Sequence, residues 1–220
     1  RSDSSAASDV YKRQDVNYIN RVTKGTYELG SVFKAFTFAS ALNEKLIKPE
    51  TEFLNLPKSI NCYGFPIREY DNEIPSDLTA EQILVRSGNI GSVRIAQKVG
   101  PEKFKSFLEK IGVLSDIQFD IEEVAPQKNY NFGKCKLATA SFGHGVATTI
   151  LQLAKGYAIL SNGGYDIKPT LVKNNHQKNT KKKKLLNKGV SEQVVNALRK
   201  IVSTGAVSYT HLRAHETPRY

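Results

Sequence analysis

The sequence predicts a packed, mainly helical domain with few strands, and three observations support this prediction. Hydrophobic residues make up 40% of the 220 residues, which is enough for a buried core and argues against general disorder. Apolar residues recur at steps of three and four in several segments, as in amphipathic helices. Capping residues, prolines and glycines mark the ends of those segments.

The first predicted helix covers residues 31–47. Its apolar side chains follow helical spacing: Phe33, Phe36, Ala39, Leu42 and Leu46. Pro49 ends the segment. Residues 49–77 are rich in Pro, Asn, Gly and Asp, so we expect a long irregular connection there.

The next helices are predicted over residues 79–86, 90–99 and 101–112. Thr79 and Gln82 have the spacing of a capping box, in which each side chain bonds the other residue's backbone N–H. The tripeptide Ser87-Gly88-Asn89 interrupts the helical pattern, and Pro101 opens the third helix.

The remaining elements are a helix over 149–160, a short strand around 165–172 and a helix over 191–203. A lysine-rich loop separates the last two. Residues 1–14 and 207–220 show no apolar periodicity and differ in composition from the rest. We expect both to be foreign or disordered flanks, which leaves one domain over 15–206.

The net charge of +11 is a local feature of the chain. Eight lysines and no acidic residue lie within 167–191, including the run from Lys181 to Lys184. No aromatic residues alternate with this run as a platform for base stacking requires, so it indicates a solvated loop and no nucleic-acid partner.

No run of about 18 apolar residues is present, and no signal-peptide pattern opens the chain. The two cysteines, Cys62 and Cys135, leave two alternatives open: a pair in an oxidising compartment, or two isolated buried thiols. No histidine is near either of them in sequence, which disfavours a cysteine nucleophile.

The candidate catalytic pair is Ser31 and Lys34, in the sequence Ser31-Val32-Phe33-Lys34. A Ser-x-x-Lys pair is expected by chance in a chain with this many serines and lysines. The residues around the pair therefore decide whether it is a candidate site. A serine at a helix start is ordinarily an N-cap. Lys34, however, lies one turn further on the same face, and burial beside Phe33 and Phe36 would lower its pKa toward the range of a general base.

A second candidate group is Ser87 and Asn89, in the loop between two predicted helices. The loop would present a hydroxyl and an amide to a cleft, or both residues would simply cap helix ends. A similar tripeptide, Ser59-Ile60-Asn61, has no helix after it and is interpreted as a turn.

Three long segments together resemble class B penicillin-binding proteins, the monofunctional peptidoglycan transpeptidases. They are YELGSVFKAFTFASAL, LTAEQILVRSGNIGSVRIAQKVG and SFGHGVATTILQLAKGYAILSNGG, in the order of the family. Their order and spacing are most similar to the division-specific (septal) branch. The resemblance covers about 15–206 and is weakest in the lysine-rich loop.

The resemblance implies an α+β fold (an α/β sandwich) like that of serine β-lactamases. Most strands of its central antiparallel sheet would be missing here. It implies the following roles: Ser31 is acylated by D-Ala-D-Ala stem peptides or by a β-lactam, Lys34 is the base, Ser87 relays a proton, and Asn89 bonds the ligand and Lys34. Gly143 and Gly145 would line the substrate site, with His144 in a structural turn. No cofactor is implied.

Two departures from the family pattern stand out. Gly88 replaces the Ser or Asp more often found in the middle of the second motif. The third motif, Lys-Thr/Ser-Gly, is absent from the 220 residues; Ser203-Thr204-Gly205 lacks its lysine, and Lys24-Gly25-Thr26 is out of order. We therefore expect this chain to be inactive and poorly stable alone.

The function predicted from the resemblance is peptidoglycan cross-linking through an acyl-serine intermediate. The implied partners are stem peptides, β-lactams and membrane proteins of a division complex. The catalytic domain would face the periplasm or cell exterior, held to the inner membrane by an anchor outside this chain. The alternatives are a β-lactamase or D,D-carboxypeptidase of the same fold, a non-catalytic β-lactam-sensing or scaffold domain, and a basic-loop binding module.

Overall fold

A computed structural model describes residues 19–121, 130–173 and 183–204. Its helices are the 3-10 helix η2 (Gly30–Phe33) and α2 (Lys34–Asn43), α3 (Ala80–Val85), α4 (Asn89–Val99), α5 (Pro101–Lys110), α6 (Lys134–Ala140), α7 (Ile150–Ser161) and α8 (Val190–Thr204). Its strands are β1 (Thr26–Glu28), β2 (Glu52–Phe53), β3 (Ser59–Cys62), β4 (Phe65–Arg68), β5 (Leu78–Thr79) and β6 (Ala147–Thr149).

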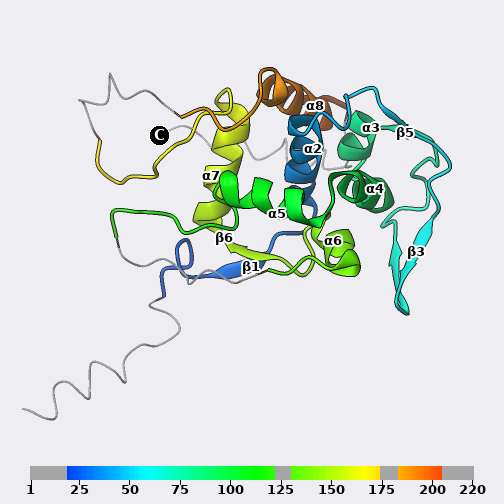
Figure 1. Cartoon of the computed structure of the whole chain (residues 1–220), viewed down its shortest axis with the longest axis horizontal. Helices are drawn as coiled ribbons and strands as arrows, with labels where there is room; N and C mark the ends of the chain where they lie inside the picture. Colours follow the sequence, from blue (N-terminus) through cyan, green and yellow to red (C-terminus); the bar gives the residue numbers. More distant parts are fainter. Residues whose placement is uncertain (1–18, 122–129, 174–182, 205–220) are drawn as a thin grey trace, which may run out of the picture.

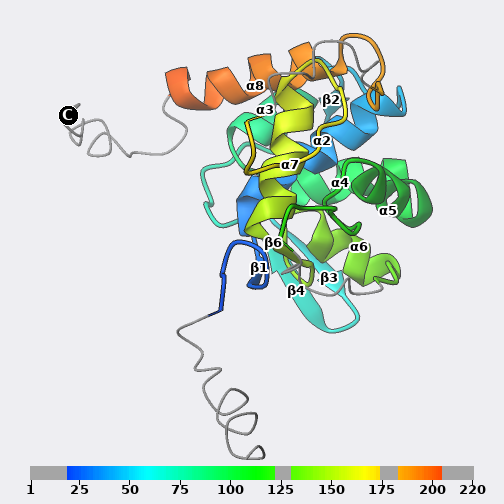
Figure 2. The same ribbon diagram turned by 90° about the vertical axis from the view of Figure 1, so that its left-hand side faces the viewer.

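Helix α2 is the centre of the molecule. All ten of its residues are buried, and α3, α4, α5 and α8 pack around it (Figure 1). The prediction of an amphipathic helix is therefore wrong in one respect, because neighbours cover every face. Helix α8 crosses one end of the bundle and also packs on α7 (Figure 2).

The predicted helix starts and ends mostly agree with the structure. The predicted capping box of Thr79 with Gln82 forms, and the structure adds a second one, Thr149 with Gln152. Each depends only on neighbouring residues. Pro101 occupies the first turn of α5. Helix α6 had no counterpart among the predicted elements.

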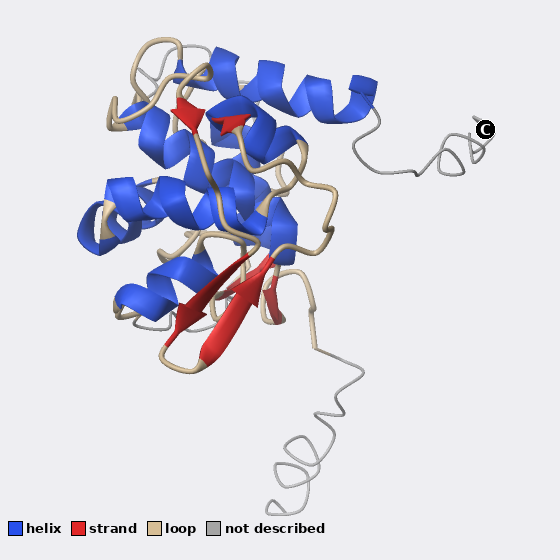
Figure 3. Cartoon of the chain, turned by 90° about the vertical axis from the view of Figure 1, so that its right-hand side faces the viewer, coloured by secondary structure: helices blue, strands red, loops and turns tan. Residues whose placement is uncertain are grey.

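The described strands form three two-stranded antiparallel sheets: β1 with β6, β2 with β5, and β3 with β4. The β3–β4 hairpin lies in the expected irregular connection and projects from one edge of the molecule (Figure 3). Ser59-Ile60-Asn61 belongs to β3, so its interpretation as a turn is wrong. The strand expected around 165–172 is also wrong, since an isolated bridge from Tyr165 to Lys184 is the pairing that forms there.

A disulfide joins Cys62 at the end of β3 to Cys135 in α6, which decides between the two alternatives for the cysteines. The sequence separation is 73 residues. Closing a loop of that length removes conformational freedom from the unfolded chain, with a stabilising effect of about 4 kcal/mol. The hairpin is thereby attached to the helical body at its far end.

The packing of the aromatic core predicts which substitutions lower stability. The Phe104 ring is fully buried and meets the Phe33 and Phe132 rings edge to face at centroid distances of 6.4 and 5.9 Å. We expect Phe104→Ala to lower the free energy of unfolding by about 3–5 kcal/mol in urea titrations. Phe65→Ala, at a ring that is 77% exposed, is the control and should change it by less than about 0.5 kcal/mol. Equal losses would contradict this assignment of the core.

Candidate functional site

Ser31 lies in the 3-10 turn η2, immediately before α2. Gly30 has a φ of +59°, a left-handed conformation that glycine adopts without a Cβ penalty, and it turns the chain into η2. Ser31 itself is exposed, and neither η2 nor α2 has a side-chain cap. The simple N-cap interpretation of Ser31 is therefore wrong.

Lys34 is the first residue of α2, and its side chain is buried to 2% exposure. Its Nζ donates to Ser31 Oγ at 3.1 Å, to the Ser87 carbonyl oxygen at 2.6 Å and to Ser87 Oγ at 2.9 Å. These three bonds use all three donors of an ammonium group. The structure thus brings together Ser31, Lys34 and Ser87, although 53 residues separate Lys34 from Ser87.

Burial lowers the pKa of Lys34 to about 8, because the charged form is poorly solvated there. The negative charge of Glu69 opposes this effect and favours the ammonium form. A lysine with such a pKa is partly neutral near physiological pH, and a neutral amine can accept a proton from a hydroxyl 3.1 Å away.

Ser87 occupies a strained backbone conformation, with a φ of +56°. A non-glycine residue in the left-handed region costs about 1 kcal/mol or more. This conformation directs both the carbonyl and the hydroxyl of Ser87 at Lys34. Strain of this kind often marks functional sites.

Asn89 begins α4 next to this group, but its side chain has a different partner from the expected one. Its Nδ2 donates to the Arg68 carbonyl at 2.9 Å, and no hydrogen bond joins it to Lys34 in the described part of the chain. Asn89 does not cap the helix either, since the N-cap of α4 is Gly88.

Glu69 supplies the missing cap of α4. Its carboxylate accepts hydrogen bonds from the backbone N–H of Asn89 at 2.6 Å and of Ile90 at 2.9 Å. Sequence reasoning missed this residue because it lies 20 residues before the helix, outside the range of any local capping pattern.

The loop around His144 lies next to the turn that carries Ser31. The backbone N–H of Gly30 donates to the Gly143 carbonyl at 3.3 Å, and Gly143 has a φ of +86°. Hydrogen bonds from His144 Nδ1, 3.1 Å from Glu28 Oε2, and from the backbone N–H of Gly145 lower the pKa of Glu28. His144 therefore contacts Glu28 in a turn that lies beside the segment carrying Ser31.

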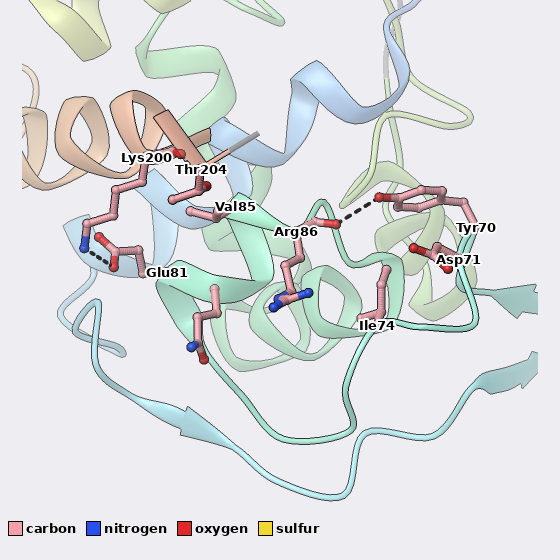
Figure 4. Close-up of a pocket in the computed structure, with 9 residues that line it drawn as sticks. Tyr70, Asp71, Ile74, Glu81, Val85, Arg86, Lys200 and Thr204 are labelled. Carbon is pink, nitrogen blue, oxygen red and sulfur yellow. Dashed lines mark hydrogen bonds and ion pairs between the residues drawn. The ribbon is translucent and has the colours of Figure 1, made fainter. Parts of the chain in front are cut away.

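A pocket of about 470 Å³ lies beside the motif at Ser87, between α3, the end of α8 and the connection from β4 to β5 (Figure 4). Arg86 and Tyr70 line it, and Tyr70 Oη donates to the Arg86 carbonyl at 3.3 Å. Ser31, Lys34 and Ser87 are not among its lining residues, so the chemistry is defined by the hydrogen-bonded cluster and not by this pocket.

The described residues contain no group of three or more His, Cys, Asp or Glu side chains arranged to hold a metal ion. No helix in the described ranges is long and apolar enough to cross a membrane. What the cluster offers is the hydroxyl of an exposed serine beside a buried amine of lowered pKa, an arrangement that suits an activated serine nucleophile.

Comparison with known proteins agrees with this class of site. The family model of the penicillin-binding protein transpeptidase domain matches residues 2–218. A peptidoglycan D,D-transpeptidase FtsI homolog from Mesostigma viride is 30% identical over 198 residues, covering 83% of this chain and 33% of the relative. Penicillin-binding protein PbpB from Mycolicibacterium smegmatis is 28% identical over 171 residues, covering 76% of this chain and 26% of that relative.

Solved structures show the same fold. The apo transpeptidase domain of penicillin-binding protein 3 from Burkholderia pseudomallei has a TM-score of 0.75 at 25% identity, covering 87% of this chain and 56% of that one. A peptidoglycan glycosyltransferase from Burkholderia ambifaria has a TM-score of 0.78 at 24% identity, covering 86% of this chain and 60% of that one.

The chain belongs to the penicillin-binding protein transpeptidase domain family. The family and α+β fold predicted from the three sequence segments are thereby confirmed. The chain spans about a third of the length of the Mesostigma relative and about a quarter of the mycobacterial one.

The burial of Lys34 makes a pH prediction. The Lys34 side chain should titrate near pH 8 in ¹³C-lysine NMR, whereas ordinary exposed lysines titrate near 10.4. Since the folded-state pKa is lowered, the unfolded chain binds more protons between about pH 8 and 10.4, and this group makes stability rise with pH across that window. A Lys34 titration above pH 10 would contradict the buried placement.

The close approach of two glycines makes a second prediction. A Cβ at Gly143 would lie 2.1 Å from the Gly30 carbonyl oxygen, whereas a Cβ at Gly145 would meet its nearest neighbour at 3.5 Å. Both residues have a positive φ, so an alanine causes backbone strain at either position. The steric clash with Gly30 is what distinguishes Gly143 from Gly145. We expect Gly143→Ala to lower the free energy of unfolding by about 1–3 kcal/mol more than Gly145→Ala. Equal losses in denaturant titrations would contradict the contact.

Proposed function

We propose that this chain carries the nucleophile half of a peptidoglycan D,D-transpeptidase site that forms an acyl-serine intermediate. The observation that carries the proposal is the hydrogen bond from the buried Lys34 Nζ to Ser31 Oγ at 3.1 Å. The names of the relatives as peptidoglycan D,D-transpeptidases support it. They do not favour the β-lactamase, scaffold or basic-loop alternatives.

In the proposed reaction the neutral Lys34 amine takes the hydroxyl proton as Ser31 Oγ bonds to the carbonyl carbon of the penultimate D-Ala of a stem peptide. The peptide C–N bond breaks, and the terminal D-Ala leaves as an amine after receiving a proton through Ser87. The amine of a second stem peptide then attacks the acyl-serine ester and loses a proton as the new amide bond forms the cross-link. Ser31 Oγ leaves and takes up a proton, which regenerates the hydroxyl. A β-lactam acylates Ser31 in the same way.

Asn89 is proposed to bond the bound peptide or drug, with Gly143 and Gly145 lining the substrate side. In the free site Asn89 Nδ2 donates to the Arg68 carbonyl, and the amide has a second N–H and a carbonyl oxygen with which to bond a ligand. The setting proposed from the relatives is the cell exterior or periplasm, at the inner membrane and in contact with division-complex proteins.

The proposal includes a requirement for a third motif. A strand with Lys-Thr/Ser-Gly would supply a second oxyanion N–H and a cation for the substrate carboxylate. The 220 residues do not contain that motif. Loss of one oxyanion donor costs about 10²–10³ in rate, so this chain by itself should acylate very slowly.

The test compares this chain with a version extended after Thr204 by the corresponding Lys-Thr-Gly segment of a relative. With fluorescent penicillin, the extended version should label at least about 100-fold faster than the chain alone, and Ser31→Ala should abolish that labelling. Strong Ser31-dependent labelling of the unextended chain would overturn the third-motif requirement. Labelling of a folded extended chain that persists in Ser31→Ala would overturn the acyl-serine mechanism.

A further inference from the structure

Three consecutive residues hold the motif Ser87-Gly88-Asn89 from one side. We call Arg68, Glu69 and Tyr70 the 68–70 segment. The Arg68 carbonyl accepts from Asn89 Nδ2 at 2.9 Å, and Tyr70 Oη donates to the Arg86 carbonyl at 3.3 Å. Between them, Glu69 binds two backbone N–H groups of α4. Contacts therefore reach both ends of the motif from one short stretch of chain.

The 68–70 segment is itself anchored. Arg68 pairs with Ser59 at the base of the β3–β4 hairpin, and the Glu69 N–H donates to the Lys58 carbonyl at 3.4 Å. At the other end of the hairpin, the disulfide from Cys62 attaches it to α6, which packs on α4. The segment is thus positioned by tertiary structure and not by the motif it contacts.

Glu69 makes the strongest of these contacts. It is partly buried, and its two carboxylate oxygens accept separate hydrogen bonds from the first turn of α4. Hydrogen bonds to a charged acceptor are about twice as strong as neutral ones, and the positive end of the helix dipole adds to the attraction.

We propose that Glu69 is a positioning residue that holds Ser87 against Lys34 by fixing the start of α4. This inference rests on the proposed function, in which Ser87 and Lys34 act during acylation. Because Ser87 is in a strained left-handed conformation, it needs an external restraint to keep its carbonyl and hydroxyl on Lys34. The cap on Asn89 and Ile90 supplies that restraint two and three residues away.

Glu69 also acts on Lys34 through its charge, since it is the charged group whose field opposes the lowering of the Lys34 pKa. The groups that accept hydrogen bonds from Lys34, the hydroxyls of Ser31 and Ser87 and the Ser87 carbonyl, are uncharged. One carboxylate therefore influences both the geometry and the basicity of the same lysine.

The same carboxylate limits which side chains position 88 accepts. A Cβ built on Gly88 would lie 3.6 Å from Glu69 Oε1, so a small side chain fits. Serine there would place a donor beside the carboxylate, whereas aspartate would place a like charge against it. We expect Gly88→Asp to be less stable than Gly88→Ser in urea titrations, and the difference should disappear in a Glu69→Gln background.

The main experiment compares Glu69→Ala and Glu69→Gln with Glu73→Gln in the full chain. Glu73 is an exposed carboxylate in the same connection and is the matched control. Amide hydrogen exchange at Asn89 and Ile90 should become about tenfold to a hundredfold faster in Glu69→Ala, and less so in Glu69→Gln. Exchange in α5 should not change. Unchanged exchange at Asn89 and Ile90 would overturn the proposal.

A second readout separates positioning from capping alone. In Glu69→Gln, which keeps the shape of the side chain and is the variant to use if the alanine variant does not fold, the Lys34 titration should move to lower pH than in the wild type and in Glu73→Gln. An unmoved titration would overturn the claimed action on Lys34. Both readouts are independent of acylation, so a chain that fails to label at Ser31 counts against the proposed function and not against the role of Glu69.

Discussion

The burial of one lysine side chain at the start of the central helix is the constraint on which the site depends. Lys34 lies at 2% exposure in a helix without a solvent-facing side, where an amine is held only if hydrogen-bond acceptors meet it. Ser31 and Ser87 supply those acceptors. The burial that lowers the pKa of Lys34 also requires that hydrogen-bond acceptors surround its amine. The basicity of Lys34 and the geometry of the site therefore both result from this burial.

Each partner of Lys34 is in turn held by chain from elsewhere. Ser31 sits on a turn that needs Gly30 in a left-handed conformation and Gly143 without a side chain, because the two backbones touch. Ser87 is held in its strained conformation between α3 and α4, with Glu69 fixing the start of α4. The β3–β4 hairpin and its disulfide to α6 link these two supports through the body of the molecule.

A helical scaffold suits this task because its central helix offers fixed spacing along one face. Ser31 and Lys34 are one turn apart, so their hydrogen bond needs no long-range folding beyond the formation of η2 and α2. The packing of α3, α4, α5 and α8 around α2 then buries the amine, while Ser31 in the turn before α2 is exposed.

The sequence by itself determined features that depend on neighbouring residues: every described α-helix except α6, the capping box of Thr79 with Gln82, and the pairing of Ser31 with Lys34. Those follow from hydrogen bonds and side-chain contacts three or four residues apart. Only the tertiary structure decided that Ser87 meets Lys34, that Glu69 caps α4, that Cys62 pairs with Cys135 and that β3 forms where a loop was expected. The partners in these contacts are separated by long stretches of chain, and a strand or a distant cap exists only when folding brings its partner alongside.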